Sequence, residues 1–234
     1  MLPQVDASTM APTNMIADGG TTSSLSSSPQ QGPSFKSADY IRTATQNYIS
    51  RSAKLQGTSN LSMKGKSIIQ SNAIIHGEYT NSQIYIGRYC YIEDGVVLMP
   101  SVAPINMDPL LENRWSSGNN KVVDNDTPPM NENEKVLPIV IGSHTHIGYN
   151  TRIYSTSVGS CVRIGNNCVL SPRSRVHDCC IIEDNSVVPD DMIIPPFSRV
   201  RGDKIVGTLP ECTGSEFVDS CVQKYLAFVK RLED

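Results

Sequence analysis

The four histidines of this chain are the side chains best suited to acid–base chemistry or zinc binding near neutral pH. They are His76, His144, His146 and His177, and His144 and His146 form an H-x-H pair. A zinc site that activates water uses about three neutral imidazoles and one open position. An acyltransferase instead needs a histidine that faces a groove as general base. The histidines therefore raise two enzyme hypotheses. Whether either is possible depends on where the elements of the fold place the histidine side chains.

The cysteines are the second group of potentially reactive side chains. They are Cys90, Cys161, Cys168, Cys179, Cys180, Cys212 and Cys221. Their number is odd, and no pair has the C-x-x-C spacing typical of zinc or thioredoxin-type sites. The N-terminus lacks a basic segment followed by an apolar one, so we expect no secretory signal. This pattern favours reduced thiols in the cytosol or nucleus.

An aliphatic residue recurs at every sixth position, apart from an interruption between Leu98 and Ile141 and one five-residue step before Val158. The positions are Ile86, Ile92, Leu98, Ile141, Ile147, Ile153, Val158, Ile164, Leu170, Val176, Ile182, Val188 and Ile194. A mostly small residue follows each of them four positions later, and Cys90, Cys168 and Cys180 occupy this small slot. A looser form of the pattern extends upstream through Ile49 to Ile75.

A six-residue period fits neither a helix nor a simple strand alternation, but it fits a solenoid of short strands. Three hexapeptides close one triangular coil, and stacked coils pair at about 4.8 Å. We therefore predict an all-β solenoid, a left-handed parallel β-helix of hexapeptide repeats with a C-terminal α-helix. The left-handed winding follows from the resemblance to known hexapeptide solenoids. We expect about six coils.

The segments outside the repeat define three predicted regions. Residues 1–36 are rich in Ser, Thr, Gly, Pro and Gln, which predicts a disordered tail. Residues 37–207 form the β-helix, interrupted by a polar, proline-containing loop at about 104–134. Residues 208–234 form a C-terminal segment with a capping helix from about Ser215 to Leu232.

Two patterns support that helix and suggest its role. Thr213 and Glu216 have the spacing of a capping box. An apolar stripe is formed by Val218, Cys221, Val222, Tyr225, Leu226, Val229 and Leu232. We expect the helix to pack on a flank or end of the solenoid, where it covers a strand edge.

The bulk composition excludes several classes of partner. The 234 residues carry a formal net charge of -3 and no block of Lys or Arg, so nucleic acid is not an expected partner. No apolar run approaches the ~20 residues that span a bilayer. Only 6% of residues are aromatic, so the core must be aliphatic.

The repeat also locates the histidines. His144 and His146 lie outside the aliphatic and small positions of the repeat, which should point inward, so we expect both to face solvent or a corner. His177 directly follows an aliphatic position, where we expect an ordinary corner residue. In a comparison with γ-type carbonic anhydrases, Met99, Tyr149 and Tyr154 stand where that family has its zinc histidines. His76-Gly77-Glu78 resembles the family's Arg-Gly-Asp element. We therefore predict no catalytic, cofactor-binding or metal-binding residue, and we assign no partner-binding residue.

Several longer stretches resemble the dynactin subunit 5 family across roughly residues 37 to 232, apart from the loop. They are Asp39-Tyr40-Ile41-Arg42-Thr43, Ile75-His76-Gly77-Glu78, Ile86-Gly87-Arg88-Tyr89-Cys90, Val176-His177-Asp178-Cys179-Cys180, Pro195-Pro196-Phe197 and Leu209-Pro210-Glu211-Cys212-Thr213. The opening D-Y-I-x-T and the closing L-P-E-C-T are the most specific. The N-terminal tail and the size of the loop depart from the family.

The resemblance implies a non-catalytic subunit of the dynactin pointed-end complex, a structural and cargo-binding adaptor for dynein-driven transport along microtubules. It implies four kinds of partner: a second hexapeptide-repeat subunit, a larger pointed-end subunit, a pointed-end actin-related protein, and membrane cargo bound through protein adaptors. The implied location is the cytoplasm and cytoskeleton. The alternative is a γ-carbonic-anhydrase-like metalloenzyme or a hexapeptide acyltransferase on the same fold.

Overall fold

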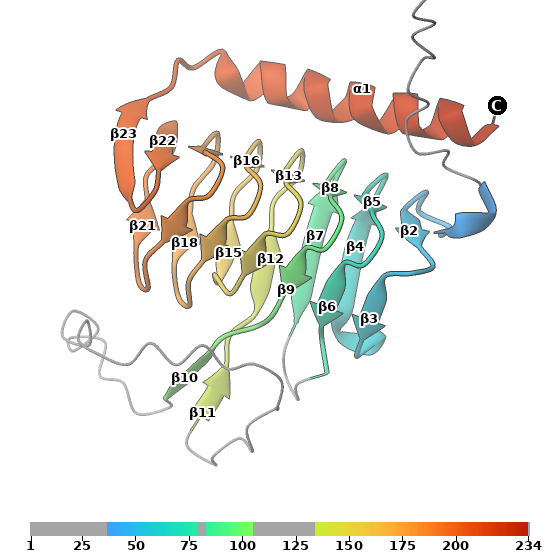
Figure 1. Cartoon of the computed structure of the whole chain (residues 1–234), viewed down its shortest axis with the longest axis horizontal. Coiled ribbons are helices and arrows are strands. Elements are labelled where there is room, and N and C mark those ends of the chain that lie inside the picture. The colour runs from blue at the N-terminus through green and yellow to red at the C-terminus, as the bar shows by residue number, and fades with distance from the viewer. Residues whose placement is uncertain (1–36, 79–82, 105–133, 234) are drawn as a thin grey trace, which may run out of the picture. The chain divides into compact units, whose positions relative to one another are not determined.

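The computed structural model describes residues 37–78, 83–104 and 134–233, and these form a parallel β-solenoid of about six coils followed by one long helix (Figure 1). The predicted fold class is thereby confirmed. The predicted tail (residues 1–36) and residues 105–133 of the predicted loop lie outside the described residues. The division of the chain into three regions stays a prediction.

Three sheets form the faces of the solenoid, and the chain visits them in the order A, B, C in each coil. Sheet A contains β2 (Tyr48–Ser50), β5 (Ile68–Ile69), β8 (Tyr91–Ile92), β13 (His146–Ile147), β16 (Arg163–Ile164), β19 (Ile181–Ile182) and β22 (Ser198–Arg201). Its edges carry the antiparallel strands β1 (Tyr40–Arg42) and β23 (Lys204–Thr208).

The other two sheets contain six parallel strands each. Sheet B contains β3 (Lys54–Gln56), β6 (Ile74–His76), β9 (Val97–Leu98), β14 (Arg152–Ile153), β17 (Val169–Leu170) and β20 (Val187–Val188). Sheet C contains β4 (Leu61–Gly65), β7 (Ile84–Arg88), β12 (Ile139–Ile141), β15 (Ser157–Val158), β18 (Arg175–Val176) and β21 (Ile193–Ile194). Single-turn 3₁₀ helices span Ser37–Asp39 and Thr58–Asn60.

The core is the aliphatic ladder that the sequence predicts. All of its members from Ile86 to Ile194 are at most 2% exposed. They also lie in register, as in the pairing of Ile147 with Ile92 on one side and Ile164 on the other. Each ladder position therefore packs against the same position of the coils above and below.

The loop leaves and rejoins the solenoid through a short ribbon. Strand β10 (Val102–Pro104) pairs antiparallel with β11 (Glu134–Val136), so the two ends of the predicted loop lie side by side. After this excursion Ile139 pairs with Ile84 of the preceding coil. The insertion thus leaves the coil-to-coil register unchanged.

Helix α1 (Thr213–Glu233) confirms the predicted helix and runs along the solenoid from the β22–β23 end toward β2 (Figure 1). The predicted capping box is wrong, because Thr213 is already helical and the Glu216 N–H donates to the Cys212 carbonyl oxygen at 3.3 Å. The predicted stripe needs two changes. Phe228 is fully buried, whereas Leu226 is 53% exposed. In the described residues, no helix is long and apolar enough to cross a membrane.

Glycines allow the coils to stack closely at the corner between sheets C and A. A Cβ on Gly142 would lie 2.4 Å from the carbonyl carbon of Gly159, and a Cβ on Gly87 would lie 2.6 Å from that of Gly142. These contacts are with backbone atoms, which cannot move without separating two coils.

We therefore predict that Gly142→Ala lowers the free energy of unfolding by about 1–3 kcal/mol, the usual cost of forcing extra volume into packed structure. Chemical denaturation measures this difference. Gly207→Ala is the matched control, because a Cβ there meets no atom within 4 Å, and it should leave the midpoint nearly unchanged. Equal stability of the two variants would contradict the close stacking.

Candidate functional site

The outer surface of sheet C is the candidate site, and one ladder of side chains crosses it. Its members pair in register from coil to coil: Ser62, Tyr85, Val140, Ser157, Arg175 and Ile193. Tyr85, Val140 and Ile193 are 41%, 42% and 58% exposed. Large apolar side chains therefore face outward at three points along this sheet.

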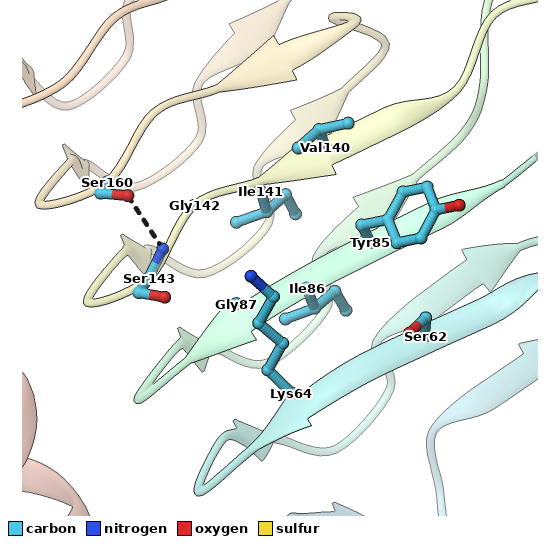
Figure 2. A pocket seen from close by; sticks show the side chains of 10 residues that line it. All are labelled: Ser62, Lys64, Tyr85, Ile86, Gly87, Val140, Ile141, Gly142, Ser143 and Ser160. Carbon is cyan, nitrogen blue, oxygen red and sulfur yellow. Dashed lines mark hydrogen bonds between the residues drawn. The ribbon is translucent and has the colours of Figure 1, made fainter.

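A shallow hollow lies at the N-terminal half of the ladder (Figure 2). It is lined by Ser62, Lys64, Tyr85, Ile86, Gly87, Val140, Ile141, Gly142, Ser143 and Ser160. Gly87 and Gly142, which the close stacking requires, leave this part of the surface without side chains. Figure 2 shows the Lys64 side chain extending across Gly87. The hollow is thus a consequence of the corner glycines, edged by one cation.

The serines beside the hollow have a structural role. The Ser143 hydroxyl oxygen accepts the Arg88 N–H at 3.0 Å, and the Ser160 hydroxyl oxygen accepts the Ser143 N–H at 3.2 Å (Figure 2). On the next coil, Asp178 Oδ1 accepts the Ser160 N–H at 2.6 Å. Each of these three side chains accepts a hydrogen bond from a backbone N–H at the corner of the preceding coil, where the strand ladders provide no acceptor. No histidine, cysteine or carboxylate is among the residues that line the hollow.

Sheet A, in contrast, is covered by α1 through a cluster of aromatic rings. Phe228 packs edge-on against Tyr40 and Tyr48, with ring centroids 5.0 and 5.6 Å apart. Tyr225 packs edge-on against Tyr89 at 5.6 Å, and its hydroxyl donates to the Gln46 carbonyl oxygen at 3.0 Å. These contacts join the C-terminal half of the helix to the first coils.

The prediction that His146 faces solvent or a corner is wrong. His146 points outward from β13, but α1 covers that face, and the side chain is only 12% exposed. Its Nε2 lies 2.7 Å from Glu93 Oε1, while its Nδ1 is buried and has no hydrogen-bond partner. A neutral imidazole that donates Nε2–H to the carboxylate fits this arrangement.

The electrostatics agree with a neutral histidine beside an ionised glutamate. Burial lowers the pKa of His146 and outweighs the hydrogen bond to Glu93, which acts in the opposite direction; Lys224 of α1 and Arg163 of β16 lower it further. The hydrogen bond from His146 lowers the pKa of Glu93 against the effect of burial. The ammonium of Lys224 lies 5.4 Å from the ring centroid of Tyr91, and burial lowers its pKa.

The other histidines lie apart from this pair. His144 stacks on Tyr89 with ring centroids 5.4 Å apart, and burial lowers its pKa. His76 Nδ1 lies 3.6 Å from Glu78 Oε1, and His177 is exposed. Within residues 37–78, 83–104 and 134–233, no group of three His, Cys, Asp or Glu side chains is arranged to hold a metal ion.

The three positions compared with zinc ligands are only partly brought together. The Met99 N–H donates to the Ile153 carbonyl oxygen, so Met99 and Tyr154 lie side by side where β9 and β14 end. Tyr149 is 43% exposed, beside the corner that precedes β14.

Sequence reasoning missed the outer face of sheet C, although one signal was present. Ile84-Tyr85-Ile86 and Ile139-Val140-Ile141 each hold three apolar residues in a row. Since side chains alternate across a strand, the middle residue must face outward.

Comparisons with known proteins point to one family. A family model described as "Dynactin subunit 5" matches residues 119–232. A dynactin subunit 5 from Dictyostelium discoideum is 34% identical over 67 residues, which cover 29% of this chain and 33% of that protein. The family recognised in the sequence is therefore confirmed over the C-terminal half, although the matched stretch spans only about a third of that relative.

Two solved structures of transferases also match this chain, with TM-scores below 0.5. An N-acyltransferase, AntD of Bacillus cereus, is 10% identical with a TM-score of 0.49 over 76% of this chain and 88% of that one. A perosamine N-acetyltransferase from Caulobacter crescentus is 16% identical with a TM-score of 0.45 over 69% of this chain and 56% of that one. Similarity at this level carries no argument about fold or activity.

We predict that acidification weakens the structure through His146. Its folded-state pKa lies below that of the unfolded chain, so the unfolded state binds a proton first as the pH falls below about 6.5. The free energy of unfolding should therefore decrease from pH 7 to pH 5. Below about pH 4.5, Glu93, whose folded-state pKa is also lowered, should add a further loss.

Denaturation curves at pH 7, 6 and 5 measure this effect. His146→Gln removes the titrating ring, so the free energy of unfolding of this variant should change less between pH 7 and pH 5 than that of the wild type. His177→Gln, at an exposed position, should retain the wild-type slope. A slope unaffected by His146→Gln would show that other groups cause the pH dependence.

Proposed function

We propose that this chain, which the family match identifies with dynactin subunit 5 over residues 119–232, is a non-catalytic subunit of the dynactin pointed-end complex. In this role it is a rigid docking part and an adaptor for cargo of the dynein motor, located in the cytoplasm at the cytoskeleton. The family match is the observation that carries the proposal. Its partners are other dynactin subunits, and membrane cargo reached through protein adaptors.

The outer face of sheet C is suited to a protein partner. Its strands contain Lys64, Arg88 and Arg175 and no Asp or Glu. The exposed apolar side chains of Tyr85, Val140 and Ile193 lie among these cations. Aromatic and arginine side chains are enriched in protein interfaces. We therefore assign to this face a partner surface that presents apolar side chains among carboxylates.

The placement of the histidines supports a non-catalytic role. A general base must reach the proton that it removes. His146 has the carboxylate partner of a general base, but its Nε2 faces Glu93 and its Nδ1 is buried. The hollow on sheet C is open, yet neither a histidine nor a carboxylate lines it. The paired imidazole and the open surface are thus in different places.

A charge placed on sheet C tests this role. Val140→Glu introduces a carboxylate at the centre of the outer ladder, where it also repels an acidic partner. We expect affinity purification of the tagged full chain from its native cells to recover other dynactin subunits. The variant should recover less by at least about tenfold, because losing an interface hot spot costs about 2 kcal/mol or more, a factor of about 30 in affinity.

Val187→Glu on sheet B is the matched control, because Val187 is also an outward valine of a short strand and is 49% exposed. It should recover as much dynactin as the wild type. Equal losses of recovered dynactin subunits with both variants would show that sheet C is not the docking surface. Failure of the wild type to recover any dynactin subunit, or stoichiometric zinc together with carbonic anhydrase or acetyl-coenzyme A-dependent transferase activity, would contradict the proposed function.

A further inference from the structure

Two cysteines occupy the same corner of neighbouring coils. Cys161 and Cys179 are each two residues before a strand of sheet A, and those strands pair Arg163 with Ile181 in register. Both cysteines have a left-handed backbone with φ of 57°. The Cys179 N–H donates to the carbonyl oxygen of Ser160 at 2.9 Å. The two residues therefore stack directly, one coil apart.

The spacing of the coils suits a disulfide at this position. Neighbouring parallel strands lie about 4.8 Å apart, and the Cα atoms of disulfide-bonded cysteines are usually about 4.4–6.8 Å apart. Each thiol also lies close enough to influence the pKa of the other. The two φ angles are equal at equivalent corner positions, so both Cβ atoms leave the corner on the same side.

Helix α1 lies over this corner and adds a third cysteine. A Cβ on Gly214 would lie 3.1 Å from Cys179 Sγ, so the first turn of α1 packs against that sulfur. Cys221 follows two helical turns later and is buried on the solenoid side of α1. Both Cys161 and Cys179 remain partly exposed. An oxidant in solution thus has access to this pair, but not to the fully buried thiols.

The remaining cysteines are placed differently. Cys90, Cys168 and Cys180 occupy the inward small slot, where each thiol donates to a carbonyl oxygen of the next coil at 3.1 Å. Cys180 is the sequence neighbour of Cys179, but it is directed into the core and fully buried. Cys212 is exposed, just before α1. Stacked thiols at a corner are therefore specific to Cys161 and Cys179 within the described chain.

We propose that Cys161 and Cys179 are a modification site, a dithiol that hydrogen peroxide converts to a reversible disulfide between two coils beneath the first turn of α1. One thiolate attacks a peroxide oxygen, the O–O bond breaks, and a sulfenic acid and water form. The second sulfur then attacks the sulfenic sulfur, the S–O bond breaks, and a second water leaves. The two sulfurs supply two electrons, and the two thiol protons end in water.

The surroundings of the pair set its reactivity. Burial, with a smaller effect of the Cys179 thiol, raises the pKa of Cys161 to about 11, and burial also raises the pKa of Cys179. Because the thiolate is the nucleophile, oxidation should be slow at pH 7. Between pH 7 and pH 9 the rate should rise about tenfold per pH unit, as the thiolate fraction does.

Oxidation of the full-length protein with hydrogen peroxide, followed by alkylation and tryptic mapping, tests the proposal. We expect the intact protein to lose two hydrogens and to yield a cross-link between residues 153–163, which contain Cys161, and residues 176–199, which contain Cys179 and Cys180. Dithiothreitol should restore both peptides. The reduced wild-type protein and the Val187→Glu variant are digested in parallel as folded controls.

Single substitutions identify the sulfurs. Cys161→Ser and Cys179→Ser should each abolish the cross-link, whereas Cys180→Ser and Cys221→Ser should retain it. A cross-link that persists in Cys179→Ser, or that joins residues 153–163 to Cys221, would overturn the assignment. So would a protein that remains fully reduced at saturating peroxide at pH 9. None of these outcomes depends on whether the chain copurifies with dynactin.

Discussion

The close stacking of coils at the corners is the constraint on which the rest of the structure depends. Neighbouring backbones approach so closely that Gly142 leaves no space for a Cβ against Gly159. The same approach leaves corner N–H groups that the short strands do not pair, and side chains such as Ser160 accept them. This geometry causes the six-residue period of the sequence, because every coil must present side chains of the same size to its neighbours at the same positions.

Stacking also distinguishes inward positions, which tolerate few residue types, from outward positions, which tolerate many. The inward ladder must be aliphatic and of nearly constant volume, since each member packs on its counterparts one coil away. Outward positions carry no such requirement, and the three sheets use them differently. Sheet A receives the aromatic contacts of α1 through Tyr48, whereas sheet C leaves Tyr85 and Val140 at the surface. The outward residues, and not the scaffold, therefore determine what each face can bind.

This separation explains what could be predicted from the sequence. The inward ladder was predictable residue by residue, because it repeats and depends only on local register. His146 was not, because its burial depends on a helix almost 70 residues later in the chain. The burial of Phe228 and the exposure of Leu226 were missed for a related reason. An apolar stripe gives the approximate face of a helix, but the partner surface selects which rings at its edge are covered.

The location of His146 connects the fold to the question of activity. An outward histidine next to a glutamate on a neighbouring coil is an arrangement that an enzyme could use as a general base. Here the same pair lies beneath α1, next to Lys224, where a protonated ring would meet a cation and would leave its Nδ1–H without an acceptor. The helix therefore turns a potentially reactive pair into part of its own packing surface. A catalytic role for the pair would require α1 to leave sheet A, at the cost of exposing Phe228 and the rings around it.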